Sequence, residues 1–324
     1  MESELNKRIV ANVLRYIPKN KKPIIYLANT LKISSESAYR RIRGDVPFTI
    51  EELVTLATCL DFSIDAIYDQ EKQNHSFYDL SRTGKNTTDF FLLMLIKYNE
   101  LLEKMKHAKR IETTMALNTF PPLFYTDFLN LFKFMFYKWL HQDKAVYRNI
   151  PFSGTVLPDE VNIFQRKMKG NFIHGNNVVL ILDINIFLNL IKAIQYYYHR
   201  KLLTNEELLL LKKDTLHLIE QYENMVQTGK YGLSKVQLYL SSLCVNHNTV
   251  YYNYDDKVEP LFWIFTINPV VIQNAGIISM QLKWLNSLKR QSALITQSNE
   301  IMQAEFFSRQ REYIDKYLTV ENTF

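Results

Sequence analysis

The sequence predicts a mainly α protein, in which an N-terminal domain of five helices is followed by a helix-rich α+β domain containing a β-hairpin. Eight glycines and nine prolines make up about 5% of the 324 residues, whereas ~12% is usual, and this disfavours a loop-rich all-β architecture. Hydrophobic residues contribute 47% and charged residues 22%, so the chain can bury a core and intrinsic disorder is excluded.

Start and stop signals divide the first 67 residues into five short helices. Ser34 and Thr49 are good N-cap residues, and Glu52 completes a capping box with Thr49. Pro23 suits the first turn of a helix, and Gly44 suits the position after the last turn. Together with the apolar spacing, these signals predict helices over about residues 5–17, 23–31, 34–43, 49–60 and 63–67.

Charge is strongly polarised along the same segment. Residues 1–43 carry ten basic and three acidic side chains, a net charge of +7, whereas residues 44–70 carry six acidic side chains and no basic one. This distribution is typical of a small domain that offers one face to phosphates, although two solvated helices of opposite charge would give the same pattern.

Residues Leu27–Gly44, LANTLKISSESAYRRIRG, carry a helix-turn-helix pattern. Leu27 and Leu31 can anchor the second helix, Ile33 can fill the turn, and the small side chains of Ala28 and Ala38 allow the two helices to cross closely. The run resembles the helix-turn-helix of the lambda-repressor-like, or Xre-type, DNA-binding domains, and the five-helix spacing out to Ile67 is similar as well. The resemblance implies that the third helix reads the major groove of double-stranded DNA.

Two positions depart from the pattern of that family. Lys32 stands in the turn, where glycine is common, and Arg41 stands near the end of the third helix, where an apolar residue is usual. We expect Ile42 to take the inward role instead. A helical bundle used for protein contacts remains the alternative interpretation of this segment.

If Ala38 and Ile42 face inward, the opposite stripe of the third helix faces DNA. Arginine can bind guanine O6 and N7 together, glutamate can accept a hydrogen bond from cytosine N4, and Arg40 is the first candidate for base reading. The predicted base-reading residues are Ser35, Glu36, Tyr39, Arg40 and Arg43. The predicted phosphate-binding residues are Lys21, Lys22 and Ser34. Each could instead be a solvated surface side chain, and Tyr39 could pack into the core.

A polar segment separates this region from the rest of the chain. The predicted domains are a helix-turn-helix domain over residues 1–70, a linker over 71–88 and a C-terminal dimerisation or sensor domain over 89–324. The expected C-terminal helices span residues 89–106, 123–140, 184–201, 205–226, 277–291 and 300–318. The expected strands span residues 110–117, 178–182, 235–243, 250–254 and 261–267, with 235–243 and 250–254 forming the β-hairpin.

Known catalytic signatures are missing from the sequence. It holds no GxGxxG loop and no HExxH helix, and Cys244 with His247 supplies only two possible metal ligands. Asp183 follows an apolar strand but has no obvious catalytic partner, so we interpret it as a strand-end cap. The protein is therefore not expected to be an enzyme, to bind a metal or to carry a cofactor.

Together with the resemblance to the lambda-repressor-like domains, which implies a bacterial transcription regulator, the composition predicts a cytoplasmic protein. No apolar run is long enough to cross a membrane, and two lone cysteines give no disulfide framework. The expected partners are double-stranded DNA, a second copy of the chain and an unknown small-molecule or protein effector. The aromatic helix 123–140 and the final helix 300–318 are the expected dimer surfaces. The alternatives are a DNA-tethered enzyme with an unrecognised C-terminal active site and a helical protein-interaction scaffold.

Overall fold

The structure is a computed structural model that describes residues 4–18, 20–60, 62, 64, 87–143, 149–169, 175–255, 257–264, 268–271 and 275–320. The chain divides into two compact units, residues 1–77 and 78–324. The predicted linker, residues 71–88, falls outside the described residues except for its last two positions, which begin a helix. Among the described helices, none has both the length and the apolar character needed to cross a membrane.

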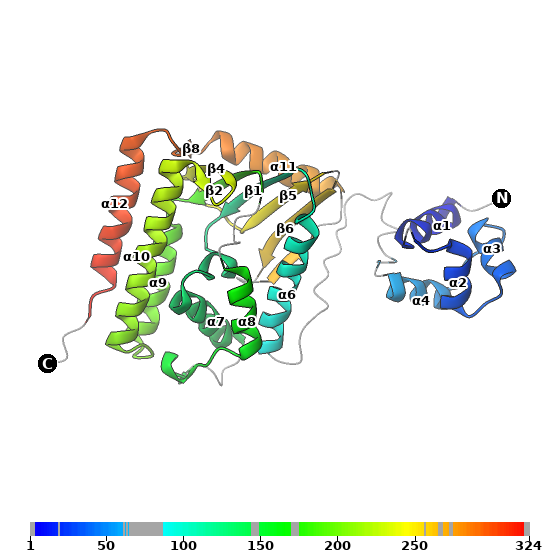
Figure 1. Cartoon of the computed structure of the whole chain (residues 1–324), viewed down its shortest axis with the longest axis horizontal. Helices are drawn as coiled ribbons and strands as arrows, with labels where there is room; N and C mark the ends of the chain where they lie inside the picture. The colour runs from blue at the N-terminus through cyan, green and yellow to red at the C-terminus, as the bar shows by residue number, and fades with distance from the viewer. Residues whose placement is uncertain are drawn as a thin grey trace. The chain divides into compact units, whose positions relative to one another are not determined.

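The N-terminal unit has four described helices, shown in blue in Figure 1: α1 (Glu4–Tyr16), α2 (Pro23–Leu31), α3 (Ser35–Ile42) and α4 (Ile50–Leu60). Their apolar faces meet in one small core, whose fully buried members include Val13, Leu27, Ala38 and Leu56. The predicted fifth helix, residues 63–67, lies outside the described residues except for Ile64. The described part of this unit is therefore a four-helix arrangement.

The second unit is built around a mixed sheet of eight strands in the order β3-β4-β2-β1-β5-β6-β7, with β8 paired to β4. Strands β1, β2 and β4 are parallel neighbours, and the pairs β1 with β5, β5 with β6, and β6 with β7 are antiparallel. The strands are β1 (Ile111–Leu117), β2 (Asn177–Asp183), β3 (Lys230–Tyr231), β4 (Ser234–Ser241), β5 (Thr249–Tyr254), β6 (Lys257–Ile264), β7 (Asn268–Val271) and β8 (Ala293–Leu294).

This sheet shows that the prediction of a mainly α fold with a β-hairpin is wrong. Strands β4 and β5, expected to pair with each other, are separated in the sheet by β2 and β1. The apolar run of β2 explains the arrangement, because a strand with most of its side chains buried needs a neighbour on each edge and cover on both faces. β5 instead forms a tight hairpin with β6, through Asp255.

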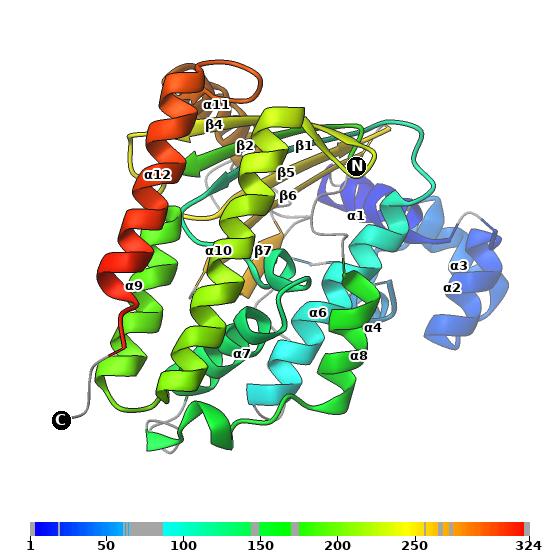
Figure 2. The ribbon, with the colours of Figure 1, turned by 60° about the vertical axis from the view of Figure 1, so that its left-hand side comes forward.

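Helices cover the two faces of the sheet unequally. The larger core lies between one face and a group of six helices, in which α10 and α12 run side by side (Figure 2). Those helices are α6 (Thr87–Met105), α7 (Leu129–Asp143), α8 (Asp159–Met168), α9 (Ile186–His199), α10 (Asn205–Thr228) and α12 (Glu300–Tyr317). The opposite face carries α11 (Ala275–Arg290), which packs Leu285 and Leu288 on Ala116 and Ile181.

Both helices expected to form a dimer surface contribute to the core of this unit instead. On α7, Phe132 and Phe136 are buried, and on α12, Phe306 and Phe307 are buried. The nearly all-round apolar character of α7 follows from its central position, because α6 and α10 both pack on it. These aromatic side chains are therefore unavailable to a second copy of the chain.

Candidate nucleic-acid interface

A tight turn joins α2 to α3. Lys32 adopts the left-handed backbone conformation with φ 55°, and its N–H and that of Ile33 both point to the carbonyl of Ala28. Ile33 is partly buried and packs against the core to which Leu27 belongs, as the sequence pattern predicts. Ser34 then caps α3 by accepting a hydrogen bond from the Ser37 N–H at 3.1 Å. The helix-turn-helix geometry therefore rests on these local contacts.

The rotation of α3 follows from its one fully buried side chain. Ala38 has no exposed surface and faces the core, and Ile42 is half-buried on the same side. The residues predicted to read bases are all exposed: Ser35, Glu36, Tyr39, Arg40 and Arg43. The last four project from the other side, whereas Ser35, three positions before Ala38, lies at the helix start on the side of Ala38. The Tyr39 side chain is 46% exposed, which rules out the alternative that it packs into the core. Four of the five predicted side chains, those of Glu36, Tyr39, Arg40 and Arg43, therefore share one accessible surface.

Arg43 and Arg40 differ in how firmly they are held. The Arg43 guanidinium lies 5.7 Å from the centre of the Tyr39 ring and 3.6 Å from the Asp45 carboxylate. Both members of that ion pair are well exposed, so the pair is weak and a phosphate or base can replace Asp45. No described residue forms a hydrogen bond or an ion pair with the Arg40 side chain. Arg40 is therefore the more available of the two.

The Arg41 side chain points toward α4, although in the sequence it lies between the exposed residues Arg40 and Arg43. Its Nε donates to Glu52 Oε2 at 2.8 Å, its second terminal nitrogen lies 2.7 Å from Glu52 Oε1, and its first donates to the Ser37 carbonyl at 3.2 Å. Each side chain of this bidentate pair is only 15% exposed. The Arg41–Glu52 pair joins α3 to the start of α4, a role that the sequence reasoning missed.

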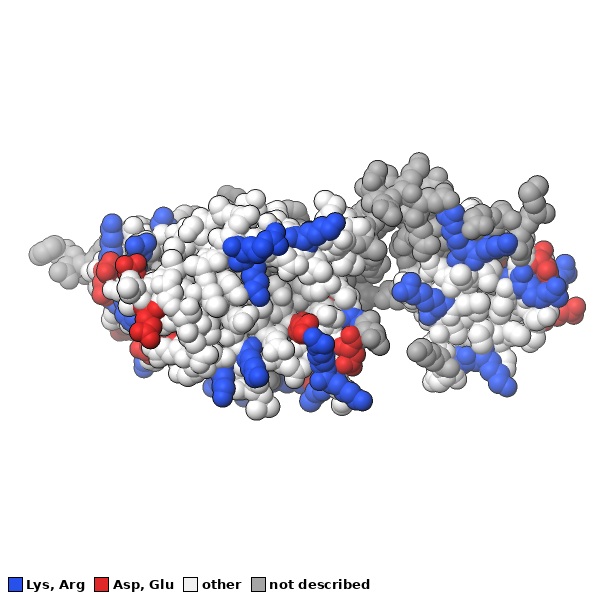
Figure 3. All heavy atoms as spheres, turned by 90° about the horizontal axis from the view of Figure 1, so that it is seen from above, with Lys and Arg blue, Asp and Glu red and all other residues white. Residues whose placement is uncertain are grey.

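The predicted phosphate-binding residues lie at the starts of two helices. Lys21 and Lys22 are exposed just before α2, and Lys22 is its N-cap. The Ser34 hydroxyl already serves the α3 cap, so its contribution is to hold the helix start, where backbone N–H groups attract anions. On the face of this unit that Figure 3 shows, basic side chains predominate over acidic ones.

The left-handed conformation of Lys32 predicts a stabilising substitution. Lys32→Gly is expected to stabilise the N-terminal unit by up to about 1 kcal/mol, because relief of the side-chain strain exceeds the added entropy of the unfolded chain. Slower amide hydrogen exchange in peptides from residues 23–60 of the full chain measures this gain. Lys7→Gly, an exposed change within α1, is the control and should destabilise by about 1 kcal/mol. Equal destabilisation by both changes would contradict the prediction.

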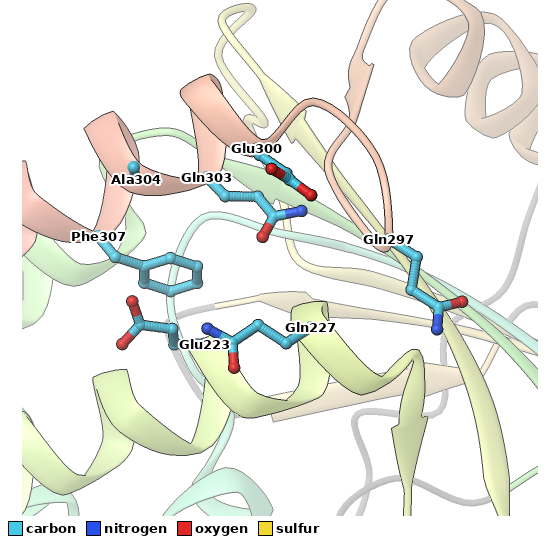
Figure 4. A pocket seen from close by; sticks show the side chains of 7 residues that line it. All are labelled: Glu223, Gln227, Gln297, Glu300, Gln303, Ala304 and Phe307. Carbon is cyan, nitrogen blue, oxygen red and sulfur yellow. The ribbon is translucent and has the colours of Figure 1, made fainter.

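The second unit carries a separate polar groove between α10 and α12. Its volume is about 540 Å³, and Figure 4 shows Glu223 and Gln227 on α10 facing Phe307 and Gln303 on α12. Glu223 forms an ion pair with Arg311 at one side of this groove. The carboxylate and amide oxygens that line the groove can accept hydrogen bonds from hydroxyl or amino groups of a ligand. The chemistry of the groove therefore suits a small polar molecule.

The residues flagged for catalysis or metal binding do not form a reactive cluster. Asp183 Oδ1 accepts the Asn185 N–H at 2.9 Å and its Oδ2 accepts the Val245 N–H at 3.2 Å, which confirms its interpretation as a strand-end cap. Cys244 and His247 are both exposed. In the part of the chain that the structure describes, no three His, Cys, Asp or Glu side chains are close enough together to hold a metal ion.

Comparison of the chain with protein-family models, with curated proteins and with solved structures gives no match.

Proposed function

We propose that the protein is a sequence-specific DNA-binding regulator of transcription in the bacterial cytoplasm, and that α3 reads the major groove. The observation that carries this proposal is the single exposed stripe on α3, opposite Ala38, behind a capped helix start. An α-helix fits the major groove, and the stripe offers arginine, glutamate and tyrosine side chains to base edges and phosphates, with Ser35 exposed at the helix start.

Different side chains position the protein on the DNA backbone and read the base sequence. Lys21 and Lys22 bind phosphates, as does the N-terminus of α3 that Ser34 caps. Arg40 is the principal base-reading residue, and Arg43 joins it once DNA displaces Asp45. Arg41 takes no part in reading, because Glu52 holds its guanidinium at the α3–α4 contact.

The second unit is assigned to dimerisation or to sensing an unidentified small-molecule or protein effector. One small helix-turn-helix unit reaches about half of an operator, so a two-fold dimer gains specificity by reading two half-sites. The aromatic side chains buried on α7 and α12 are not offered to a dimer, whereas exposed residues of these helices such as Leu129 and Ile301 are accessible.

The experiment that tests the function uses the full-length protein. Selection from a random pool of duplexes is expected to yield one palindromic sequence, and affinity for it should fall steeply as salt rises, because bound Lys and Arg release counterions from DNA. Lys21→Glu with Lys22→Glu should weaken binding to every duplex.

Two results would contradict the proposal. A pool from which no sequence is enriched would favour the protein-interaction scaffold. Binding that is insensitive to both salt and the paired lysine substitutions would exclude the N-terminal unit as the DNA-binding part. A DNA-tethered enzyme would bind DNA in the same way as a regulator. Turnover of a substrate by the second unit would distinguish the enzyme from the regulator.

A further inference from the structure

The groove between α10 and α12 in the second unit combines polar side chains with one aromatic ring. Its volume of about 540 Å³ lies within the usual range for small-molecule sites, about 300–1,000 Å³. Phe307 is buried, and in Figure 4 its ring points from α12 toward α10. Ala304, one turn before it, contributes only a methyl group to the lining and leaves the space beside the ring open.

Two amide groups of the lining already donate their N–H groups to backbone carbonyls. Gln303 Nε2 donates to the Ile295 carbonyl at 2.6 Å and to the Ser298 carbonyl at 2.8 Å, which uses both of its hydrogens. In Figure 4 the Gln303 oxygen points toward α10. Gln297 Nε2 donates to the Thr228 carbonyl at 3.2 Å. The Gln303 oxygen is therefore left to accept a hydrogen bond from a ligand, and it requires a donor there.

The two carboxylates of the groove differ in how they are compensated. Glu223, which faces Phe307, forms an ion pair with Arg311. Glu300 lies two turns before Phe307 on α12, about 10 Å along the helix axis, and forms no hydrogen bond or ion pair with a described residue. None of the described residues that line the groove is basic. The N-terminal end of the α12 dipole offsets about half a charge, so the Glu300 end of the groove remains suited to a cation.

Gln227 supplies a second kind of polar group between these ends. Its side chain is exposed on α10, faces Gln303 in Figure 4 and forms no hydrogen bond with a described residue. Its amide can therefore both donate to a ligand and accept from it. A hydroxyl group meets both requirements, because it donates one hydrogen bond and accepts others.

We infer that this groove binds a small primary amine that carries several hydroxyl groups, such as an amino sugar. The ammonium group binds the Glu300 carboxylate, and hydroxyl groups bind the Gln303 oxygen and the Gln227 amide. The carbon ring of the ligand packs against Phe307. The role of such an amine as an effector rests on the proposed sensing function of the second unit, whereas its binding can be measured without DNA.

The test is isothermal titration calorimetry of the full-length protein with D-glucosamine, in phosphate buffer without DNA and at a pH that keeps the amine protonated. Two further probes separate the contacts: D-glucose keeps the hydroxyl groups but has no charge, and cyclohexylamine keeps the charge and a ring but has no hydroxyl group. We expect saturable binding of glucosamine. Both other probes should bind at least about tenfold more weakly, because each lacks one of the two kinds of contact.

Two variants place the ligand in the groove. Glu300→Gln keeps an acceptor but removes the charge, so it should weaken glucosamine binding about tenfold and leave the binding of glucose unchanged. Glu305→Gln, the same change at an exposed residue of α12 outside the lining, is the matched control and should alter neither. Ala304→Trp fills the space beside Phe307 and should abolish glucosamine binding, while circular dichroism checks that each variant is folded.

Three results would overturn the inference. The first is the absence of saturable glucosamine binding, and the second is glucose binding as tight as that of glucosamine, which would exclude a role for the Glu300 charge. The third is glucosamine binding that survives Ala304→Trp, because the amine would then bind outside the groove. None of these results bears on DNA binding by the N-terminal unit, and a failure to select an operator would leave the calorimetric result unchanged.

Discussion

Replacing Arg40 with alanine is expected to lower the affinity of the full-length protein for its selected operator by about 5- to 150-fold, a loss of about 1–3 kcal/mol. The guanidinium is exposed on α3 and forms no hydrogen bond or ion pair with a described residue, so the substitution breaks no such contact in the described part of the chain. One base preference should relax, because an arginine that binds guanine O6 and N7 discriminates at a single position. Competition assays with operators substituted one base pair at a time measure both effects.

Lys22→Ala is the matched control. Its ammonium group is placed to bind phosphate, so its loss should weaken cognate and random duplexes alike and reduce the slope of log affinity against log salt by about one. If Arg40→Ala also weakened both kinds of duplex equally, Arg40 would be a phosphate contact, and base reading would pass to the other exposed side chains of α3.

The local structure of the N-terminal unit could be predicted because its signals are close together in sequence. The capping box between Thr49 and Glu52 is present in both directions, with hydrogen bonds of 3.0 and 3.2 Å. The small side chain of Ala38 fixed which face of α3 is exposed. Arg41 could not be assigned in this way, because its partner lies eleven positions away on another helix and the contact depends on how α3 and α4 pack.

In the second unit, a helix start could be predicted from the sequence, whereas the pairing of the strands could not. Thr204 and Glu207 have the spacing of a capping box at the start of α10, and the structure contains both hydrogen bonds of that box. The strand partners could not be read from the sequence, because β1 pairs with β2 and β5 across long stretches of chain that local patterns do not connect. The predicted hairpin failed for that reason. Helix α8 and the short strands β3, β7 and β8 were missed, the strands because two to four residues show too little alternation to be recognised.

The ion pair between Arg41 and Glu52 is expected to stabilise the contact between α3 and α4. Arg41→Leu is expected to destabilise the N-terminal unit by about 2–3 kcal/mol, although it restores the apolar residue that the helix-turn-helix pattern favours at this position. The loss arises at Glu52, whose side chain is only 15% exposed and would lose the cation that compensates its charge. Hydrogen exchange in residues 23–60 is a suitable measurement, because all three tryptophans lie in the second unit and their fluorescence would not report on this one.

Adding Glu52→Gln to Arg41→Leu should recover most of that stability. Glutamine can still accept the Thr49 N–H at the start of α4, while the uncompensated charge disappears. The paired variant should also bind the selected operator as tightly as the native chain, because neither side chain belongs to the exposed stripe of α3. If it regained stability but lost base preference, Arg41 would have to leave Glu52 and enter the major groove when DNA binds, and the α3–α4 contact would then be part of recognition. If the paired variant instead keeps its base preference, Arg41 serves only to hold α3 against α4. Arg40 and Arg43 are then the arginines of α3 that can reach DNA.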